Sequence, residues 1–302
     1  MKKLVILLII TSIIIVTLVS STIFAQEKRI YNDGVVDYVP VGTAFSITAE
    51  DLESGIKEIQ VSVDGSPFQT YTEPIILVEE GRHIIVYRAI DITGNVSRES
   101  IYTVVVDGTP PDGLVSVIGP KYISEKGIYI TSESMIVLWA EDALSGVQSI
   151  YFKLDENPYI AYTEPIKIEE EGLHRAEAYA VDNVGNRTPT FVVEGYVDNS
   201  PPLVAILPKE DLISVNGKYY TNRDNEYFVR ATDRYSGVRA IYISIDDSPY
   251  ALYSGPFRIQ SQGLHKITAR AVDNIGNESS PVSLSFFVDV TPPVPEIGAT
   301  VE

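Results

Sequence analysis

Acidic side chains recur at loop positions of this 302-residue chain with a fixed spacing of 91 residues. Three sets of aspartates follow this period, and they are Asp51, Asp142 and Asp233; Asp91, Asp182 and Asp273; and Asp107, Asp198 and Asp289. Carboxylate and amide oxygens from several loops are the ligands that Ca²⁺ takes, about six to eight at a time. The chemistry that these residues could do is therefore cation binding.

The predicted calcium sites lie where one repeat passes into the next. In an immunoglobulin-like sandwich the loops that carry the first two aspartate sets lie at one end of the domain, which also receives the linker from the preceding repeat. The two predicted sites are Asp107, Asp142, Asp182 and Asn186, and Asp198, Asp233, Asp273 and Asn277. A bound ion would offset the repulsion between the carboxylates and stiffen the joint.

A second interpretation of the same residues needs no ion. Aspartate and asparagine side chains hydrogen-bond to nearby backbone amides in turns, and Gly94, Gly185 and Gly276 would supply the positive φ that such turns need. The segment Thr109-Pro110-Pro111 would stiffen a linker without any ion. No loop has the spacing of an EF-hand. The sequence leaves both interpretations open.

The elements that must position these residues can be predicted from the alternation of apolar and polar side chains. Ile59, Val61 and Val63 share one face of a predicted strand, and the same pattern recurs one and two periods later. Two further predicted strands place these residues inward: Ile47, Leu138 and Val229 on the preceding strand, and Ile85, Ala176 and Ile267 on a later one. Turn signals such as Asp64-Gly65-Ser66-Pro67 close these strands. The pattern predicts an all-β fold with three tandem immunoglobulin-like antiparallel β-sandwich repeats.

The amino-terminal residues have the layout of a secretory signal peptide. A positive start is followed by an apolar run from Leu4 to Val19 and by small residues up to Ala25. An uncleaved membrane anchor is the alternative. The predicted domains are a signal peptide at residues 1–25, repeats at 26–107, 108–198 and 199–289, and a tail at 290–302. The absence of cysteine is normal for an exported bacterial protein and excludes a lipidated cysteine.

Five short motifs occur in the same order in each repeat, and in the first repeat they read AEDLESG, YTEP, EEGRH, AIDITGN and VDGTPP. As a set they resemble the OmpL47-type domain family of bacterial envelope proteins and, more loosely, the modules of large bacterial adhesins. The resemblance covers roughly residues 30–296. It implies contact with a host matrix or a cell surface, and the family name implies an outer-membrane barrel.

Charge argues for the sandwich over the barrel and excludes some partners. Arg88, Lys153 and Arg230 occupy outward positions where lipid would require apolar side chains. The net charge of −18 repels nucleic acid and anionic lipid surfaces. We therefore expect no nucleic-acid partner, and membrane association only through the signal segment or by peripheral contact.

The three histidines, His83, His174 and His265, follow the same period. Each lies on the core-facing side at the place of the tyrosine corner of immunoglobulin domains, which predicts a hydrogen-bonded structural role and neither a catalytic nor a metal-binding one. The chain also has no Gly-x-Ser-x-Gly elbow and no glycine-rich phosphate loop. These observations predict a protein that is not an enzyme.

The sequence as a whole predicts an exported protein of the bacterial envelope, at the outer membrane, the cell surface or in the periplasm. We expect a monomer that acts in adhesion or as a structural interaction module, with an extracellular matrix protein, a cell-surface protein or a glycan as partner. No cofactor is required, and calcium in the joints is one of the two interpretations of the acidic loops. An integral outer-membrane β-barrel is one alternative. A carbohydrate-binding accessory module is another, because outward tyrosines such as Tyr151 and Tyr242 could stack on sugars.

Overall fold

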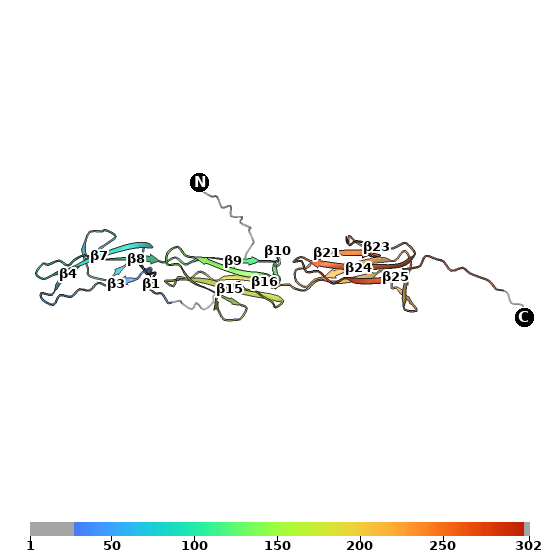
Figure 1. Cartoon of the computed structure of the whole chain (residues 1–302), viewed down its shortest axis with the longest axis horizontal. Coiled ribbons are helices and arrows are strands. Elements are labelled where there is room, and N and C mark those ends of the chain that lie inside the picture. The colour runs from blue at the N-terminus through green and yellow to red at the C-terminus, as the bar shows by residue number, and fades with distance from the viewer. Residues whose placement is uncertain (1–26, 299–302) are drawn as a thin grey trace, which may run out of the picture. The chain divides into compact units, whose positions relative to one another are not determined.

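The computed structural model describes residues 27–298, which form 25 strands and no helix (Figure 1). Among these residues no helix is long and apolar enough to cross a membrane. The predicted signal peptide lies outside the described residues. The strands repeat with the 91-residue period and form tandem immunoglobulin-like β-sandwiches, as the sequence predicts.

Each repeat has a six-stranded sheet, and the order of equivalent strands in this sheet is the same in all three repeats. In the first repeat the order is β1 (Tyr31–Asn32), β2 (Asp37–Pro40), β8 (Ser100–Asp107), β7 (Gly81–Asp91), β4 (Ile56–Val63) and β5 (Gln69–Thr70). In the second repeat it is β10 (Lys121–Ser124), β11 (Gly127–Ile130), β16 (Phe191–Val197), β15 (Gly172–Asp182), β13 (Val147–Leu154) and β14 (Ile160–Ala161). In the third repeat it is β18 (Ile213–Val215), β19 (Lys218–Thr221), β25 (Val282–Val288), β24 (Gly263–Asp273), β21 (Val238–Ile245) and β22 (Ala251–Leu252).

The second, smaller sheet of each sandwich differs between repeats. In the third repeat it has three strands, β17 (Leu203–Pro208), β20 (Glu226–Thr232) and β23 (Phe257–Arg258). In the second repeat β9 (Asp112–Ile118) pairs with β12 (Met135–Glu141), and an isolated bridge joins Ile136 to Ile166. In the first repeat only β3 (Ala44–Phe45) and β6 (Ile75–Ile76) are present among the described residues.

Two compact units contain the described residues. One comprises the chain up to Ser116 together with Val137–Pro165 and Arg175–Val193, and the other comprises Val117–Ile136, Ile166–His174 and the chain from Glu194 onward. The first unit contains the whole of the described first repeat, the second contains the whole of the third, and the second repeat is divided between them.

Apolar side chains that alternate along the strands form the cores. In the first repeat the buried cluster is Val39, Leu77, Ile85, Val104 and Val106. In the third repeat it is Tyr227, Ile259, Ile267, Phe286 and Val288. The predicted inward residues Leu138 and Val229 are buried, with exposed fractions of 7% and 3%.

A β-bulge recurs at the start of one long strand in each repeat. The register shifts between Ile56 and Glu58 in β4, and the equivalent shift occurs in β13 and β21. A bulge adds a residue and increases the local twist of the strand. It lies directly after the loop that begins with Asp51, Asp142 or Asp233, so it helps to set the direction of that loop.

Candidate metal centres

Three aspartates from three segments meet at each of two equivalent places. One cluster is Asp107, Asp142 and Asp182, and the other is Asp198, Asp233 and Asp273. Within each cluster one carboxylate oxygen per residue lies within 4.8 Å of the others. Two oxygens bound to one Ca²⁺ lie at most about 5 Å apart, because each lies about 2.3–2.6 Å from the ion. The spacing therefore fits a shared cation.

The fold brings each aspartate of the first cluster to this place from a strand end or a turn. Asp107 ends β8, Asp182 ends β15, and Asp142 opens the turn between β12 and β13. Asp107 and Asp182 are fully buried, whereas Asp142 is partly exposed. All three belong to the same compact unit.

The turn role that the sequence allowed is present in both acidic loops of this cluster. Oδ1 of Asp142 accepts hydrogen bonds from the amides of Leu144 and Gly146, at 3.1 and 2.8 Å. Oδ1 of Asp182 accepts from the amides of Val184 and Asn186, at 3.0 and 2.7 Å. Each of these aspartates thus uses one oxygen to close its own turn and has a second oxygen for another partner.

Asp107 joins the two loops across the start of the next repeat. Its Oδ2 accepts the main-chain N–H of Ser145 at 3.1 Å. The side-chain amide of Asn186 donates to the main-chain carbonyl of Asp107 at 3.2 Å and to Oδ2 of Asp182 at 2.6 Å. The side-chain nitrogen of Asn186 therefore faces the carboxylates and connects Asp107 to Asp182 by hydrogen bonds. In this arrangement Asn186 does not present its oxygen to the cluster, as the predicted metal ligand would.

The second cluster repeats these contacts, with one difference. Ser236 donates its amide to Oδ2 of Asp198 at 3.0 Å, and Asn277 donates to the carbonyl of Asp198 at 3.0 Å and to Oδ2 of Asp273 at 2.7 Å. Oδ1 of Asp198 is buried and has no hydrogen-bond partner among the described residues. Its counterpart, Oδ1 of Asp107, accepts from the amide of Thr109 at 3.2 Å.

Burial affects the charge state of the Asp198 carboxylate. A buried carboxylate without partners is costly unless a cation or a proton neutralises it. Burial raises the pKa of Asp198, and the neighbouring carboxylates of Asp233 and Asp273 raise it further. Burial, together with the carboxylate of Asp107, likewise raises the pKa of Asp182. Both clusters thus hold negative charge at a cost that a divalent cation would offset.

The first repeat shows the same motif without a third carboxylate among the described residues. Asp91 accepts from both the side chain and the amide of Asn95, at 2.7 and 2.8 Å. The hydrogen bond from the Asn95 side chain is the main cause that lowers the pKa of Asp91 to about 2. The turn alone thus stabilises the charged form of this carboxylate. The pKa of the equivalent Asp182 is raised instead, because Asp182 is buried beside Asp107 of the preceding repeat.

A lysine lies beside the first cluster. Nζ of Lys28 donates to Oδ1 of Asn186, and the amide of Arg29 donates to the carbonyl of Val184 at 3.2 Å. The ammonium group of Lys28 thus contacts the same side chain that donates to Asp107 and Asp182. Within residues 27–298 no lysine or arginine hydrogen-bonds to Asn277, so the second cluster is the stronger candidate for a metal ion.

The histidines have the hydrogen-bonded role that the sequence predicts. Nδ1 of His83 lies 2.7 Å from Oδ2 of Asp64, and its Nε2 lies 2.9 Å from the carbonyl oxygen of Glu79. His265 makes the same two contacts, with Asp246 and with the carbonyl of Ser261. Nε2 of His174 contacts the carbonyl of Glu170 at 2.8 Å.

Sequence reasoning missed the link between the histidines and a set of turn aspartates, of which Asp64 and Asp246 contact His83 and His265. Asp64, Asp155 and Asp246 are 91 residues apart and all have positive φ, from 52° to 55°. Aspartate tolerates this left-handed conformation in turns better than most residues. The common period of the aspartates and histidines was the signal that could have linked them.

Many of the candidate sugar-binding rings contact neighbouring side chains. Tyr151 stacks on Tyr179 with ring centroids 5.2 Å apart, and the guanidinium of Arg187 lies 3.5 Å from the centroid of Tyr179. In the first repeat Arg88 lies over Phe68 at 4.0 Å. These contacts cover ring faces with cationic side chains. They favour a structural role for this group of aromatic residues.

No family model matches this chain, and no curated protein matches it. Among solved structures, it is similar to the fibronectin(III)-like modules of Clostridium thermocellum CbhA, with 16% identity and a TM-score of 0.29 over 56% of this chain and 94% of that one. It is also similar to a structure concerning host cell surface retention of a bacterial ice-binding adhesin, with 11% identity and a TM-score of 0.34 over 77% and 86% of the two chains. The FN1–FN3 domains of chicken CNTN1 give 14% identity and a TM-score of 0.26 over 82% and 99%. Scores this low say nothing about a ligand or a partner of this chain.

Proposed function

We propose that this chain is a non-enzymatic, exported repeat protein whose immunoglobulin-like modules are joined through calcium-binding aspartate clusters. Two observations support the calcium part of this proposal. Oδ1 of Asp198 is buried and has no hydrogen-bond partner among the described residues. One carboxylate oxygen of Asp198 also lies within 4.8 Å of carboxylate oxygens of Asp233 and Asp273. Three carboxylates and one divalent cation leave far less uncompensated charge than three carboxylates alone.

The ligands would come from both sides of a repeat boundary. Asp198 directly follows β16, the last strand of the second repeat. In the third repeat Asp233 directly follows β20, and Asp273 ends β24. An ion bound by all three aspartates would therefore connect the end of the second repeat to the sandwich of the third. Water molecules would complete the coordination shell, as is common for calcium sites with few protein ligands.

The test is thermal unfolding of the full chain in excess calcium and in chelator. If calcium binds the native state alone at about 100 times its Kd, it stabilises the protein by about 2.7 kcal/mol. This gain corresponds to a rise in Tm of several degrees. Equal melting temperatures in the two conditions would contradict the calcium proposal.

Matched variants make this test specific. Asp142→Asn combined with Asp233→Asn changes one carboxylate in each cluster and should abolish the calcium-dependent rise in Tm. Asp51→Asn changes the equivalent residue of the first repeat, which belongs to no such cluster among the described residues, and should leave the rise unchanged.

The biological setting proposed for this module is the bacterial envelope, where it would act in adhesion or as a structural interaction module. The tandem immunoglobulin-like repeats, the net charge of −18 and the set of motifs that resembles OmpL47-type domains support this proposal. The contacts of His83 and His265 with carboxylates and carbonyls support a non-enzymatic role.

Protease digestion of intact cells that produce the protein tests the surface location. Loss of the protein while a periplasmic control survives would support adhesion, and binding to matrix proteins would be measured next. Survival of both until the outer membrane is opened would contradict a surface role and leave a periplasmic scaffold.

A further inference from the structure

The described part of the first repeat lacks the strand that opens the other two. In the third repeat β17 pairs antiparallel with β20, from Leu203 with Thr232 to Pro208 with Tyr227. In the second repeat β9 takes the same place beside β12. The 91-residue period puts the counterpart of both strands at residues 21–27, of which only Glu27 is described. Glu27 lies against Gly185 of the second repeat.

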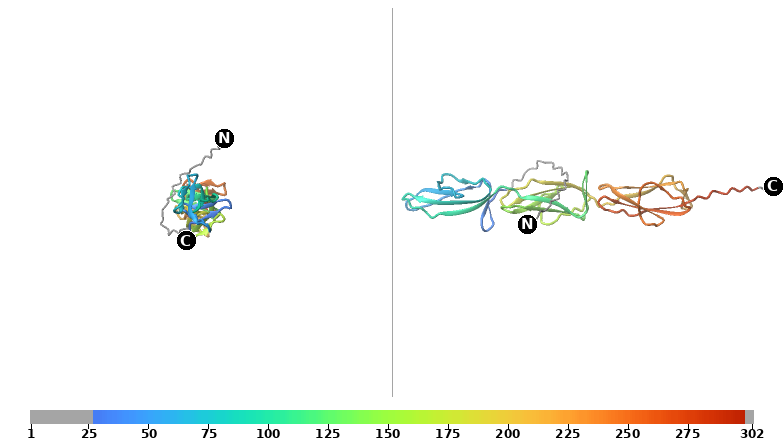
Figure 2. Two further views of the ribbon diagram at one scale, coloured as in Figure 1. Left: turned by 90° about the vertical axis from the view of Figure 1, so that its left-hand side faces the viewer. Right: turned by 90° about the horizontal axis from the view of Figure 1, so that it is seen from above.

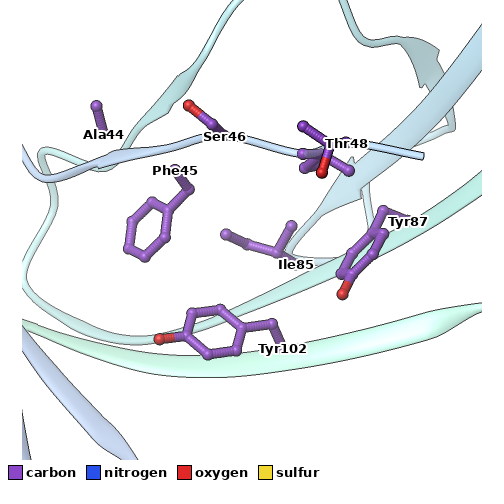
Figure 3. A pocket seen from close by; sticks show the side chains of 8 residues that line it. Ala44, Phe45, Ser46, Thr48, Ile85, Tyr87 and Tyr102 are labelled. Carbon is purple, nitrogen blue, oxygen red and sulfur yellow. The ribbon is translucent and has the colours of Figure 1, made fainter. Parts of the chain in front are cut away.

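A groove marks the place of this strand in the first repeat. It has a volume of about 410 Å³ and is lined by the segment from Ala44 to Thr48 and by Ile85, Tyr87 and Tyr102 (Figure 3). These residues lie on β7 and β8 and along β3, which are the counterparts of β24, β25 and β20. In the third repeat β17 contacts β20, β24 and β25. The groove is thus the space that a first strand occupies elsewhere in the chain.

Burial of equivalent residues supports this comparison. Tyr227 and Val229 have exposed fractions of 1% and 3%. Their counterparts in the first repeat, Phe45 and Ile47, are only half-buried. The side chain of Ile206, on β17, packs against the core that contains Tyr227. An added strand would give Phe45 and Ile47 the cover that β17 gives in the third repeat.

The last described residues of the chain are equivalent in sequence to a first strand but belong to no sheet. Thr291-Pro292-Pro293 aligns with Ser200-Pro201-Pro202, so the residues from Val294 to Gly298 align with Leu203–Leu207 of β17. The structure places residues 291–298 outside any strand, and all are exposed (Figure 1 and Figure 2). Val294 and Ile297 are 85% and 102% exposed.

We infer that residues 294–298 of one copy add as a strand to the groove of the first repeat of a second copy. In the register of β17 on β20, Ile297 takes the place of Ile206 and lies opposite Ile47. Glu296 then takes the place of exposed Ala205 and faces water. Main-chain hydrogen bonds and one inward apolar side chain are the usual means by which an extended peptide completes an open sheet.

Proline at position 295 is compatible with this arrangement. The added strand lies at the edge of the small sheet, as β17 does in the third repeat, and proline is accepted on edge strands. The donor and acceptor surfaces differ, so the contact is head-to-tail and joins copies in an open series. The expected monomer would thus become a concentration-dependent assembly.

Sedimentation velocity of the exported protein at increasing concentration tests the inference, after mass spectrometry has fixed its amino terminus. We expect the sedimentation coefficient to rise with concentration. Ile297→Asp should weaken self-association about tenfold or more, because it places a charge against the groove. This residue lies outside every strand, so the variant should leave the repeats folded. Val294→Asp is the matched control, since its side chain would face outward like that of Leu203, which is 78% exposed.

Cysteine trapping tests the register directly, because the chain has no cysteine of its own. Ser46 and Gly298 are the counterparts of Phe228 and Leu207, which pair directly in the third repeat. Ser46→Cys with Gly298→Cys should form intermolecular disulfides upon oxidation, and Ser46→Cys with Val294→Cys should form far fewer.

Three results would overturn the inference. One is a sedimentation coefficient that is independent of concentration together with no disulfide-linked multimers. Another is a disulfide formed only within one chain. The third is retention of residues 21–26 in the exported protein together with no self-association, which would assign the groove to the chain's own leader.

Discussion

Ser236 donates its main-chain N–H to Oδ2 of Asp198 over 3.0 Å. The other oxygen of this carboxylate is buried and has no hydrogen-bond partner in the part of the chain that the structure describes. The same geometry recurs between Ser145 and Asp107 at 3.1 Å. The amide thus positions each linker aspartate against the two loop aspartates of the next repeat.

Asp198→Asn should stabilise the calcium-free protein and abolish calcium binding at the second cluster. Removal of an uncompensated buried charge should raise the free energy of unfolding in chelator by about 1–2 kcal/mol. Denaturant unfolding measures this change, and calorimetric titration with calcium measures the lost site. Asp289→Asn is the control, because Asp289 is the exposed counterpart of Asp198 and belongs to no aspartate cluster among the described residues. A destabilised Asp198→Asn protein in chelator would contradict this account.

The gain in stability that Asp198→Asn gives in chelator should become smaller as the pH is lowered. A carboxyl group whose pKa is raised in the folded state binds protons more tightly there, so the folded state loses stability as pH rises through that pKa. The difference in unfolding free energy between variant and wild type in chelator should therefore reach its maximum at neutral pH, where the carboxyl group of Asp198 is charged. It should vanish below the unfolded pKa of about 3.9. A difference that grows on acidification would exclude a raised pKa for Asp198.

His83 should titrate above its ordinary pKa and contribute stability that is lost as pH rises. The hydrogen bond that the His83 imidazole donates to the carboxylate of Asp64 is the main cause that raises the pKa of His83. Its contribution is complete below the unfolded value of about 6.5 and disappears as pH passes the folded value. Nuclear magnetic resonance titration of the imidazole measures this pKa, and Asp64→Asn should lower it. An unchanged titration in Asp64→Asn would show that the carboxylate is not the cause.

Glu171→Ala should loosen the link that follows the second repeat. Oε1 of Glu171 accepts from the amide of Asn199 at 2.9 Å and from Oγ of Ser200 at 2.7 Å, as Glu80 does with Gly108 and Thr109. Amide hydrogen exchange at Asn199 should speed up by about fivefold or more, because its acceptor is lost. Glu169→Ala removes a neighbouring exposed carboxylate and is the control. Equal protection of Asn199 in both variants would mean that the Glu171 contact does not order the linker.

Ile267→Ala should destabilise the third repeat by about 3 kcal/mol, because it opens a cavity in a closed core. Ile267 is fully buried among Tyr227, Ile259 and Phe286. Leu264→Ala is the control, since Leu264 is 74% exposed and should change stability by less than about 0.5 kcal/mol. Denaturant unfolding compares the two variants. A similar loss of unfolding free energy in both variants would show that burial of Ile267 in the core does not stabilise this repeat.

The 91-residue period made the architecture and the aspartate clusters predictable. Equivalent residues of tandem repeats take equivalent places, so Asp107 could be brought to Asp142 and Asp182 from topology alone. Alternation predicted the inward residues Leu138, Val229 and Ile267 in the same way.

Other features depend on contacts that a one-dimensional pattern does not carry. The orientation of Asn186, with its amide nitrogen toward the carboxylates, follows from its acceptors in three dimensions. The place of Lys28 beside Asn186 follows from the path of a segment with no regular pattern. The two-stranded small sheet of the first repeat was also missed, although the period places its first strand in the predicted leader.

The parallel pairing between an early strand and the last strand of a repeat bears on how the repeat would respond to force. In the first repeat Asp37–Pro40 lies parallel to Ser100–Asp107, and in the second Ile128–Ile130 lies parallel to Gly195–Val197. Tension on the chain at both ends of a repeat would drag these neighbours past each other along their length. Their hydrogen bonds would then carry the load together and would have to break at once, whereas a hairpin pulled from its open end breaks one bond at a time. This parallel pairing, which is present in all three repeats, would therefore let each repeat resist unfolding by tension along the chain.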